Sequence, residues 1–402
     1  MAVSSPPTGS IYLDHAAATP LRPDVDEAMR EAAREAFGNA SSPHGFGRLA
    51  RRTLEEARER ILAALGARTA GPGRDRLVFT SGATESNRLA LLGRGGPPGV
   101  VAWSPRDHAS VAAAAHDLVR RGWRGVHLGL EGDGRRAAAT AELMATLPSA
   151  GPPTVLCLTT ACGQTGTLDL PEDEMLADTR ISLHVDHTQA VAWISRPIRE
   201  VPAATLTLAP HKFGGPRGIG GLVIRGDVTL EPLHPGPQEL GLRGGTEAVP
   251  LATGFAVALE AAVAQRATAG ERVATLRRRL EEGVAAAAAA AGLRPMVVGA
   301  AAQRAPHVAT IAVEGVDRQS LVMAADLAGV CLATGTACAS GSSEPSAAVD
   351  ALQLPAWVAQ SAFRASLGTT TTVDEVDEAV RRLALVFQGI ATHALQPTSV
   401  SR

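Results

Sequence analysis

A regular alternation of short apolar runs with helical segments begins near residue 74 and limits the fold more than any other feature of the chain. The apolar runs, rich in Val, Leu, Ile and Thr, lie at 76–82, 99–105, 154–160, 181–187, 204–210 and 219–225. Runs this short and this continuously apolar are typical of strands buried on both faces of a sheet. Between several of them lie Ala-rich segments with helical periodicity, such as 109–122. The sequence therefore predicts an α/β sheet covered by helices on both sides, with ligands at the carboxyl ends of its strands.

The pattern changes near residue 247, where a long helical region leads into a second part of the chain. We expect this region, 247–291, to break near residues 268–270, which read Thr-Ala-Gly. Apolar runs at 307–315 and 329–335 predict strands beyond it, and 371–390 predicts an amphipathic terminal helix. At 402 residues the chain is too long for one simple core, which also favours two domains.

Charge and hydropathy argue against several kinds of partner. The formal net charge of −2 gives no reason to expect nucleic acid or an anionic membrane surface. No apolar run approaches the roughly 20 residues that span a bilayer, and residues 1–10 do not resemble a secretory signal. Four cysteines without CxxC spacing predict reduced thiols, and therefore a cytoplasmic protein.

Lysine is almost absent from the chain. Of 38 Lys and Arg side chains, only Lys212 is a lysine. Chance survival in an arginine-rich composition would explain a single lysine. However, a guanidinium keeps its proton, whereas an amine can lose it and form an imine. Lys212 stands between His211 and a Gly-rich turn, and we take it as a candidate imine-forming residue.

Two further segments offer a phosphate-binding helix start and a buried carboxylate, which would complement an imine-forming lysine. Residues 78–91 run from a strand into a helix through small residues, and the free N–H groups of such a joint suit a phosphate. An ordinary helix cap is the alternative. Asp186 ends a buried strand, where a carboxylate is costly unless paired, and a pyridinium nitrogen is an apt partner. Together with Lys212, these features match the requirements of pyridoxal phosphate.

A metal site at the same strand end is the competing interpretation. His184, Asp186 and His187 lie close together in the sequence. On a strand, however, His187 points to the opposite face from the other two. No further cluster of His or Cys supplies the missing ligands, so we expect no metal.

A series of ordered motifs extends through nearly the whole chain. It runs from "YLDHAAATP" at 12–20 to "FRASLGTTTTVDEVDEAV" at 363–380. Between them lie "FGNASSPHGFGRLAR", "VFTSGATESN", "HVDHTQAV", "PHKFGGPRGIGGL", "ELGLRGGTEAV" and "ATGTACASGSSEPS". With these motifs the chain resembles a cysteine desulfurase of the aminotransferase class V family. The resemblance implies a pyridoxal-phosphate-dependent transferase of fold type I, with a mixed, mostly parallel seven-stranded sheet and a smaller α+β C-terminal domain.

The resemblance also implies how the chain is divided and assembled. Residues 11–258 would form the large cofactor-binding domain, the first of them packing with the small domain. Residues 259–394 would form that small domain and carry a cysteine loop, and 1–10 and 395–402 would be tails. The chain would act as a homodimer with shared active sites.

The residues implied to hold the cofactor centre on Lys212, which would bind it as an imine and later move the substrate's Cα proton. The other implied contacts are Ala83, Thr84 and His211 for the phosphate, Thr246 for the phosphate of the other subunit, Asp186 for the ring nitrogen and Gln189 for the ring hydroxyl. His108 would stack on the ring and serve as acid and base.

Two residues are implied to handle the substrate. Arg364 would bind the substrate carboxylate through a two-pronged contact. Cys338 lies in a Gly/Ser/Ala-rich stretch typical of an exposed mobile loop, and its thiolate would attack the substrate sulfur and become a persulfide. The length of this stretch resembles the long-loop desulfurases, which deliver sulfur to a protein acceptor. Cys331, in an apolar run, is interpreted as a core residue.

Two stretches depart from the family pattern. Where the family has Ala-Asn-Asn-Glu-Thr-Gly, this chain has "ACGQTG" at 161–166, so Gly163 replaces an Asn that contacts cofactor and substrate. The same stretch introduces Cys162, interpreted as inert, with an alternative sulfur carrier as the other interpretation. Ala209 replaces a phosphate-binding serine. These changes predict altered cofactor tuning or substrate choice.

Three functions follow from these observations. The leading hypothesis is conversion of L-cysteine to L-alanine, with the sulfur left as a persulfide on Cys338 for a protein acceptor. The second is a C–S lyase, selenocysteine lyase or other β-eliminating enzyme that acts on a modified amino acid, motivated by Gly163 and Ala209. The third is a catalytically silent homologue that acts as a binding partner.

Overall fold

The computed structural model describes residues 9–136, 154–170, 181–335 and 344–394. Cys338 and almost all of both predicted tails lie outside these residues. Within the described part, no helix is both long enough and apolar enough to cross a membrane.

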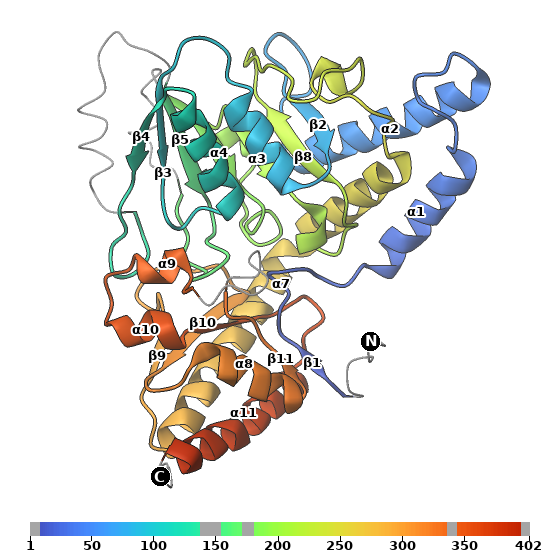
Figure 1. The fold of residues 1–402 in the computed structure, drawn as a ribbon. Helices are drawn as coiled ribbons and strands as arrows, with labels where there is room; N and C mark the ends of the chain where they lie inside the picture. Colours follow the sequence, from blue (N-terminus) through green and yellow to red (C-terminus); the bar gives the residue numbers. More distant parts are fainter. Residues whose placement is uncertain (1–8, 137–153, 171–180, 336–343, 395–402) are drawn as a thin grey trace, which may run out of the picture.

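A seven-stranded sheet forms the centre of the larger part of the molecule (Figure 1). Its strands follow the order β2 (Arg76–Thr80), β8 (Gly220–Ile224), β7 (Thr205–Leu208), β6 (Ile181–Asp186), β5 (Thr154–Thr159), β3 (Val100–Trp103) and β4 (Arg124–His127). The pairs from β7 to β4 are all parallel, and β8 is antiparallel to both of its neighbours. The predicted mixed, mostly parallel seven-stranded sheet is therefore confirmed.

All six apolar runs of the first part form strands of this sheet, but β4 gives no such signal in the sequence. Its residues read Arg-Gly-Val-His, and three of the four are exposed. β4 lies at the edge of the sheet and pairs only with β3. An exposed edge strand needs no continuous apolar run, which explains why periodicity does not reveal it.

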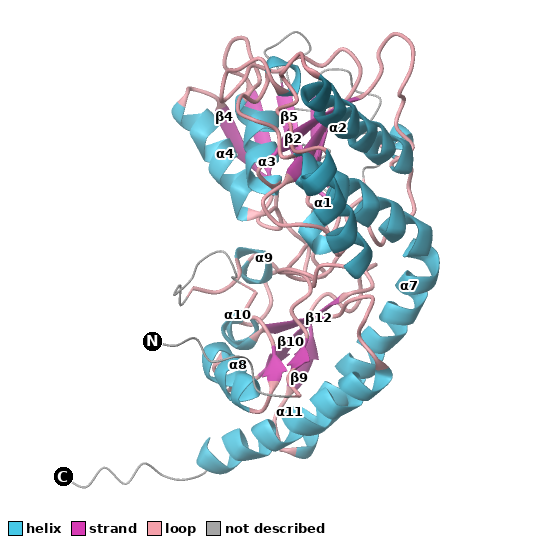
Figure 2. Ribbon diagram, turned by 90° about the vertical axis from the view of Figure 1, so that its right-hand side faces the viewer, coloured by secondary structure: helices cyan, strands magenta, loops and turns pink. Residues whose placement is uncertain are grey.

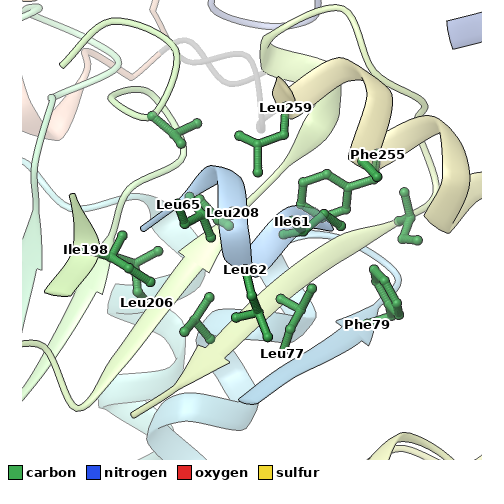
Figure 3. Close-up of a cluster of buried hydrophobic side chains, with 14 of the residues drawn as sticks. Ile61, Leu62, Leu65, Leu77, Phe79, Ile198, Leu206, Leu208, Phe255 and Leu259 are labelled. Carbon is green, nitrogen blue, oxygen red and sulfur yellow. The ribbon is translucent and has the colours of Figure 1, made fainter. Parts of the chain in front are cut away.

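Helices cover both faces of the large sheet because successive side chains of a strand point to opposite sides. On one face, α2 (Gly45–Ala64) and the first half of α7 (Val249–Ala290) cover the strands. Figure 3 shows Ile61 and Leu62 of α2, with Leu65 directly after this helix, beside Leu206 and Leu208 of β7. Phe255 and Leu259 of α7 belong to the same cluster. On the other face, α3 (Ala83–Leu92) and α4 (Ala109–Arg120) form a separate apolar cluster. α1 (Pro23–Glu35) packs against α7.

α7 corrects the expectation of a break near residues 268–270. It is one helix of 42 residues that passes through Gly270 without interruption (Figure 2). A single glycine inside a helix costs only about 1 kcal/mol relative to alanine, and the surrounding Ala, Arg and Glu residues favour the helix. The predicted domain boundary at 258/259 falls inside this helix, which packs against both parts of the chain.

A three-stranded antiparallel sheet forms the smaller part, in the order β12 (Phe363–Ser366), β10 (Val308–Val313) and β9 (Pro295–Val297). The second half of α7 and α11 (Val373–Ala394) pack on it, and α8 (Arg318–Leu327), α9 (Ala347–Asp350) and α10 (Ala356–Ser361) complete this part. The predicted strand at 307–315 corresponds to β10. The predicted strand at 329–335 is shorter: only β11 (Val330–Cys331) forms, and it pairs in parallel with β1 (Ile11–Tyr12). Through this pair, residues near the start of the chain join the smaller part.

Candidate active site

Several strands deliver the predicted site residues to one edge of the large sheet. β2, β3, β5, β6 and β7 point the same way, so their carboxyl ends meet at that edge. Asp186 is the last residue of β6, and Lys212 ends the short 3₁₀ turn η2 (Pro210–Lys212) after β7. His108 follows β3, and Gly163 follows β5. The helix α3 starts directly beyond β2.

Lys212 and Gln189 share one backbone acceptor. The Lys212 amine donates to the carbonyl oxygens of Ala16 at 2.7 Å and Ala17 at 2.9 Å. The Gln189 side-chain amide also donates to the Ala16 oxygen, at 2.8 Å. The two residues expected at the reactive carbon and the ring hydroxyl of the cofactor are therefore held side by side by the segment that follows β1.

Asp186 is a buried carboxylate kept in its charged form. Burial alone would raise the pKa of Asp186, but hydrogen bonds from Thr188 and Asn87 and the nearby His108 outweigh it and lower that pKa. The Thr188 backbone N–H donates to one carboxylate oxygen and the Asn87 amide to the other, both at 3.0 Å. The oxygen of that amide faces His184 Nε2 at 3.0 Å. Two hydrogen bonds leave a carboxylate with capacity for another donor.

His108 occupies the N-cap of α4. Its Nδ1 accepts from the backbone N–H of Ser110 at 3.1 Å and lies 2.8 Å from the Ser110 hydroxyl. That hydroxyl in turn accepts from the Asn87 amide at 2.9 Å. Because Nδ1 is an acceptor here, the proton of neutral His108 resides on Nε2. Asn87 thus links His108 to Asp186.

The start of α3 forms a compact backbone joint over β8. A Cβ on Gly220 of β8 would lie 2.5 Å from the Gly82 backbone, so only glycine permits this approach. Ala83 and Thr84 open the helix, and Thr84 is exposed. Burial, together with the neighbouring Lys212, lowers the pKa of His211 to about 4.

Arg364 of β12 reaches from the smaller part of the molecule into the site. Its guanidinium donates to the Gly163 carbonyl at 2.8 Å and pairs with Asp14 at 2.7 Å. The residue is 3% exposed, and its Nε has no hydrogen-bond partner among the described residues. A buried cation with an unused N–H is suited to a further anionic partner.

The departures from the family pattern have distinct structural settings. A Cβ built on Gly163 would lie 3.4 Å from Gln189 Nε2, which is ordinary contact, so the backbone leaves room for a side chain there. Cys162 and Ala209 are fully buried. Cys331 is only partly buried in β11, which corrects its interpretation as a core residue. In the β1–β11 pair, Ile11 and Val330 face the core, whereas Cys331 lies on the outer face opposite the exposed Tyr12.

Thr246 stands apart from the other predicted residues. It is exposed in the segment just before α7, and no hydrogen bond of the described chain connects it with the group around Lys212. Cys338 lies outside the described residues, so the structure does not place it.

Sequence reasoning missed three residues that complete the site: Asp14, Asn87 and His307. Asp14 and Asn87 lie within quoted motifs, but nothing in the motifs shows that they bind Arg364 and Asp186. His307 lies in none of the quoted motifs, and it contacts Gln189, which is 118 positions away. No signal in the sequence alone could have found that contact.

The residues present fit pyridoxal phosphate. The charged, buried Asp186 suits a protonated ring nitrogen. The N-cap of α3, Gly82, makes no side-chain capping bond, so the first turn of this helix can donate backbone N–H groups to a phosphate. The Arg364 Nε, which has no hydrogen-bond partner within the described ranges, suits a substrate carboxylate. Among the described residues, no group of three or more His, Cys, Asp or Glu could hold a metal ion.

Buried neutral histidines predict a loss of stability in mild acid. Burial lowers the pKa of His184 and His187 to about 4 and that of His307 to about 3, against 6.5 for the free side chain. As the pH falls from 6.5 towards 4, the unfolded chain binds protons that the folded chain does not. The free energy of unfolding should therefore drop by about 1.4 kcal/mol per pH unit for each histidine in this window.

Urea denaturation at pH 7 and at pH 4.5 measures this loss. In the variant His187→Gln this histidine no longer titrates, so the slope of stability against pH should shrink by its share, about 1.4 kcal/mol per pH unit. Equal stability at both pH values would contradict this prediction, because it would mean that the folded protein protonates these histidines as readily as the unfolded chain does.

The fold and the site define a class: an α/β protein built to hold pyridoxal phosphate at the carboxyl edge of its sheet. Comparison with known sequences specifies the family. The profile of Aminotransferase class-V matches residues 11–379, and the chain belongs to this pyridoxal-phosphate-dependent family.

Individual relatives and solved structures that resemble the chain are named cysteine desulfurases or NifS-like proteins. It is 35% identical to the IscS-like cysteine desulfurase of Mycobacterium tuberculosis, over 97% of this chain and 100% of the relative. It is 32% identical to cysteine desulfurase IscS of Dictyoglomus turgidum, over 95% of each chain. Among solved structures, a NifS-like protein superposes with a TM-score of 0.84 at 25% identity, covering 94% of this chain and 100% of the other. DndA from Streptomyces lividans gives 0.69 at 29% identity, covering 88% and 99%.

Proposed function

We propose that this protein is a pyridoxal-phosphate-dependent cysteine desulfurase. It converts L-cysteine and a protein thiol into L-alanine and a protein persulfide. The observation that carries the proposal is the shared acceptor of Lys212 and Gln189 beside the buried, charged Asp186. Full-length similarity to named cysteine desulfurases supports the same reaction.

The cofactor contacts follow from this proposal. Lys212 attaches the cofactor, Asp186 pairs with the ring nitrogen and Gln189 donates to the ring hydroxyl. The backbone at Ala83 and Thr84 binds the phosphate with His211. Bound pyridoxal phosphate supplies a ring that takes up the electrons released at the substrate's Cα.

The remaining chemistry belongs to the side chains of this protein. Arg364 orients the substrate through its carboxylate, using the Nε that lacks a partner among the described residues. Lys212 takes the proton from Cα, and His108 offers the proton on Nε2 while Ser110 holds Nδ1. The Cys338 thiolate attacks the substrate sulfur, so the carbon–sulfur bond breaks as the sulfur–sulfur bond forms.

The partners follow from the same roles. A homodimer would bring Thr246, exposed in the single chain, to the phosphate of the other subunit. A protein acceptor would take the sulfur from Cys338. The three cysteines that the structure describes are free thiols, which supports a reducing cytoplasmic setting.

A single turnover with L-cysteine tests the proposal. We expect one equivalent of alanine and, by peptide mass spectrometry, one added sulfur on the Cys338 peptide. The variant Cys162→Ala is the matched control and should behave as the wild type. Sulfur found on Cys162 would move the carrier role to that residue. A Cys338→Ala variant that still transfers sulfur would rule the proposal out.

The room at Gly163 favours a second candidate, a β-eliminating enzyme for a larger modified amino acid. A panel of S-substituted cysteines separates the two functions. Pyruvate from such substrates, with negligible alanine from free cysteine, would favour elimination. A silent binding protein is disfavoured because Lys212, Asp186 and Arg364 all retain the contacts described above.

A further inference from the structure

His307 lies in the loop directly before β10, within contact distance of the site but outside every recognised motif. It is 2% exposed. Its ring stacks on Trp193 with centroids 4.8 Å apart and planes 13° from parallel. Its Nε2 lies 3.0 Å from Oε1 of Gln189. The stack and the burial together fix the position of the ring.

The hydrogen bonds determine which nitrogen of His307 carries the proton. Gln189 Nε2 faces the Ala16 carbonyl at 2.8 Å, and a carbonyl only accepts. The amide nitrogen of Gln189 is therefore on the Ala16 side, and its oxygen faces His307. Because that oxygen also only accepts, His307 must donate from Nε2. Nδ1 is then the unprotonated nitrogen, which agrees with its lack of any hydrogen-bond partner in the described chain.

The charge state of His307 keeps this arrangement constant. Burial, followed by the charges of Arg364, His15, Lys212 and Arg277, lowers the pKa of His307 to about 3. The ring is therefore neutral near pH 7, and its single proton stays on Nε2.

The consequence concerns Gln189. A side-chain amide can turn over and exchange its oxygen and nitrogen at little cost unless its partners specify one orientation. Ala16 accepts from the nitrogen of the Gln189 amide and His307 donates to its oxygen, so both partners specify the same orientation. With the oxygen held by His307 and one N–H donated to Ala16, the second N–H of Gln189 has no acceptor in the part of the chain that the structure describes and can donate to a ligand beside Lys212.

We propose that His307 is a positioning residue that locks the Gln189 amide so that it presents an N–H donor, and never its oxygen, to the ring hydroxyl of the cofactor. This inference rests on the proposed function, since it deepens the role given there to Gln189. The donor stabilises the negative charge on the ring oxygen, and His307 guarantees that the donor faces it.

Two variants test whether His307 fixes the orientation of the Gln189 amide. His307→Leu removes the donor but keeps an apolar side chain against Trp193, whereas His307→Gln retains an N–H near the position of Nε2. In the cofactor-loaded protein, a donor at the ring oxygen lowers the pH at which the visible absorbance titrates. We expect His307→Leu to raise that pH by about one unit or more, and His307→Gln to restore most of the shift. Equal titrations for the wild type and the Leu variant would overturn the proposal.

A second measurement is independent of the bound cofactor. Nitrogen NMR of the wild type without added cofactor reports the tautomer of His307, and we expect the proton on Nε2 from pH 5 to 8. A proton on Nδ1 would overturn the inference even if the enzyme is active. If the Nε2 proton is present but the protein binds no pyridoxal phosphate, the proposed function fails. The role of His307 in orienting Gln189 toward the cofactor then fails with it.

Discussion

The variant Lys212→Arg should fold normally yet be colourless and inactive. Its guanidinium can still donate to the Ala16 and Ala17 carbonyls, which accept from the lysine amine at 2.7 and 2.9 Å, so the local fold is preserved. A guanidinium keeps its proton and cannot attach the cofactor or accept the substrate's Cα proton. Loss of the proton transfer alone should lower the rate by roughly 10²–10⁴-fold.

Visible absorbance after reconstitution and alanine formation from cysteine are the two measurements. Arg217, exposed in the same turn, provides the matched control. Arg217→Lys adds a second amine nearby and should leave colour and turnover unchanged. The double variant Lys212→Arg/Arg217→Lys should remain colourless, because the amine is then in the wrong place. A yellow, active Lys212→Arg protein would refute the assignment of Lys212.

The large sheet could be predicted because most of its strands are buried on both faces. β5 and β7 are buried at every residue, and such strands leave a continuous apolar run in the sequence. β4 lacks that run because it is an exposed edge. The unbroken course of α7 was mispredicted because one glycine costs less than its helix-forming neighbours contribute.

The site was predictable only in part. Asp186 ends a predicted strand and Lys212 follows one, so the rule that ligands bind at carboxyl ends placed these two together, whereas His108 came only from the family resemblance. The contacts that set their chemistry are long-range. Asp14 meets Arg364 across 350 positions and His307 meets Gln189 across 118. Such pairs depend on how the smaller part packs against the sheet, which no local pattern encodes.

Asp186→Asn is expected to impair both the chemistry and the local fold. The uncharged amide no longer stabilises a positive ring nitrogen, and loss of a preorganised electrostatic partner of this kind costs about 10²–10³-fold in kcat. In addition, the new amide nitrogen must face either the Thr188 N–H or the Asn87 amide, both of which are donors. That conflict should lower the free energy of unfolding by about 1–3 kcal/mol.

A second substitution separates these two effects. In Asp186→Asn/Asn87→Asp, the acceptor is moved to residue 87, where it can accept from His184 Nε2, from the Ser110 hydroxyl and from the amide at 186. We expect the double variant to recover most of the lost stability in urea denaturation. Its kcat should stay low, because the carboxylate now lies in α3 and not at the end of β6. If kcat recovers together with stability, Asp186 acts through the local fold and its charge toward the ring nitrogen is not required.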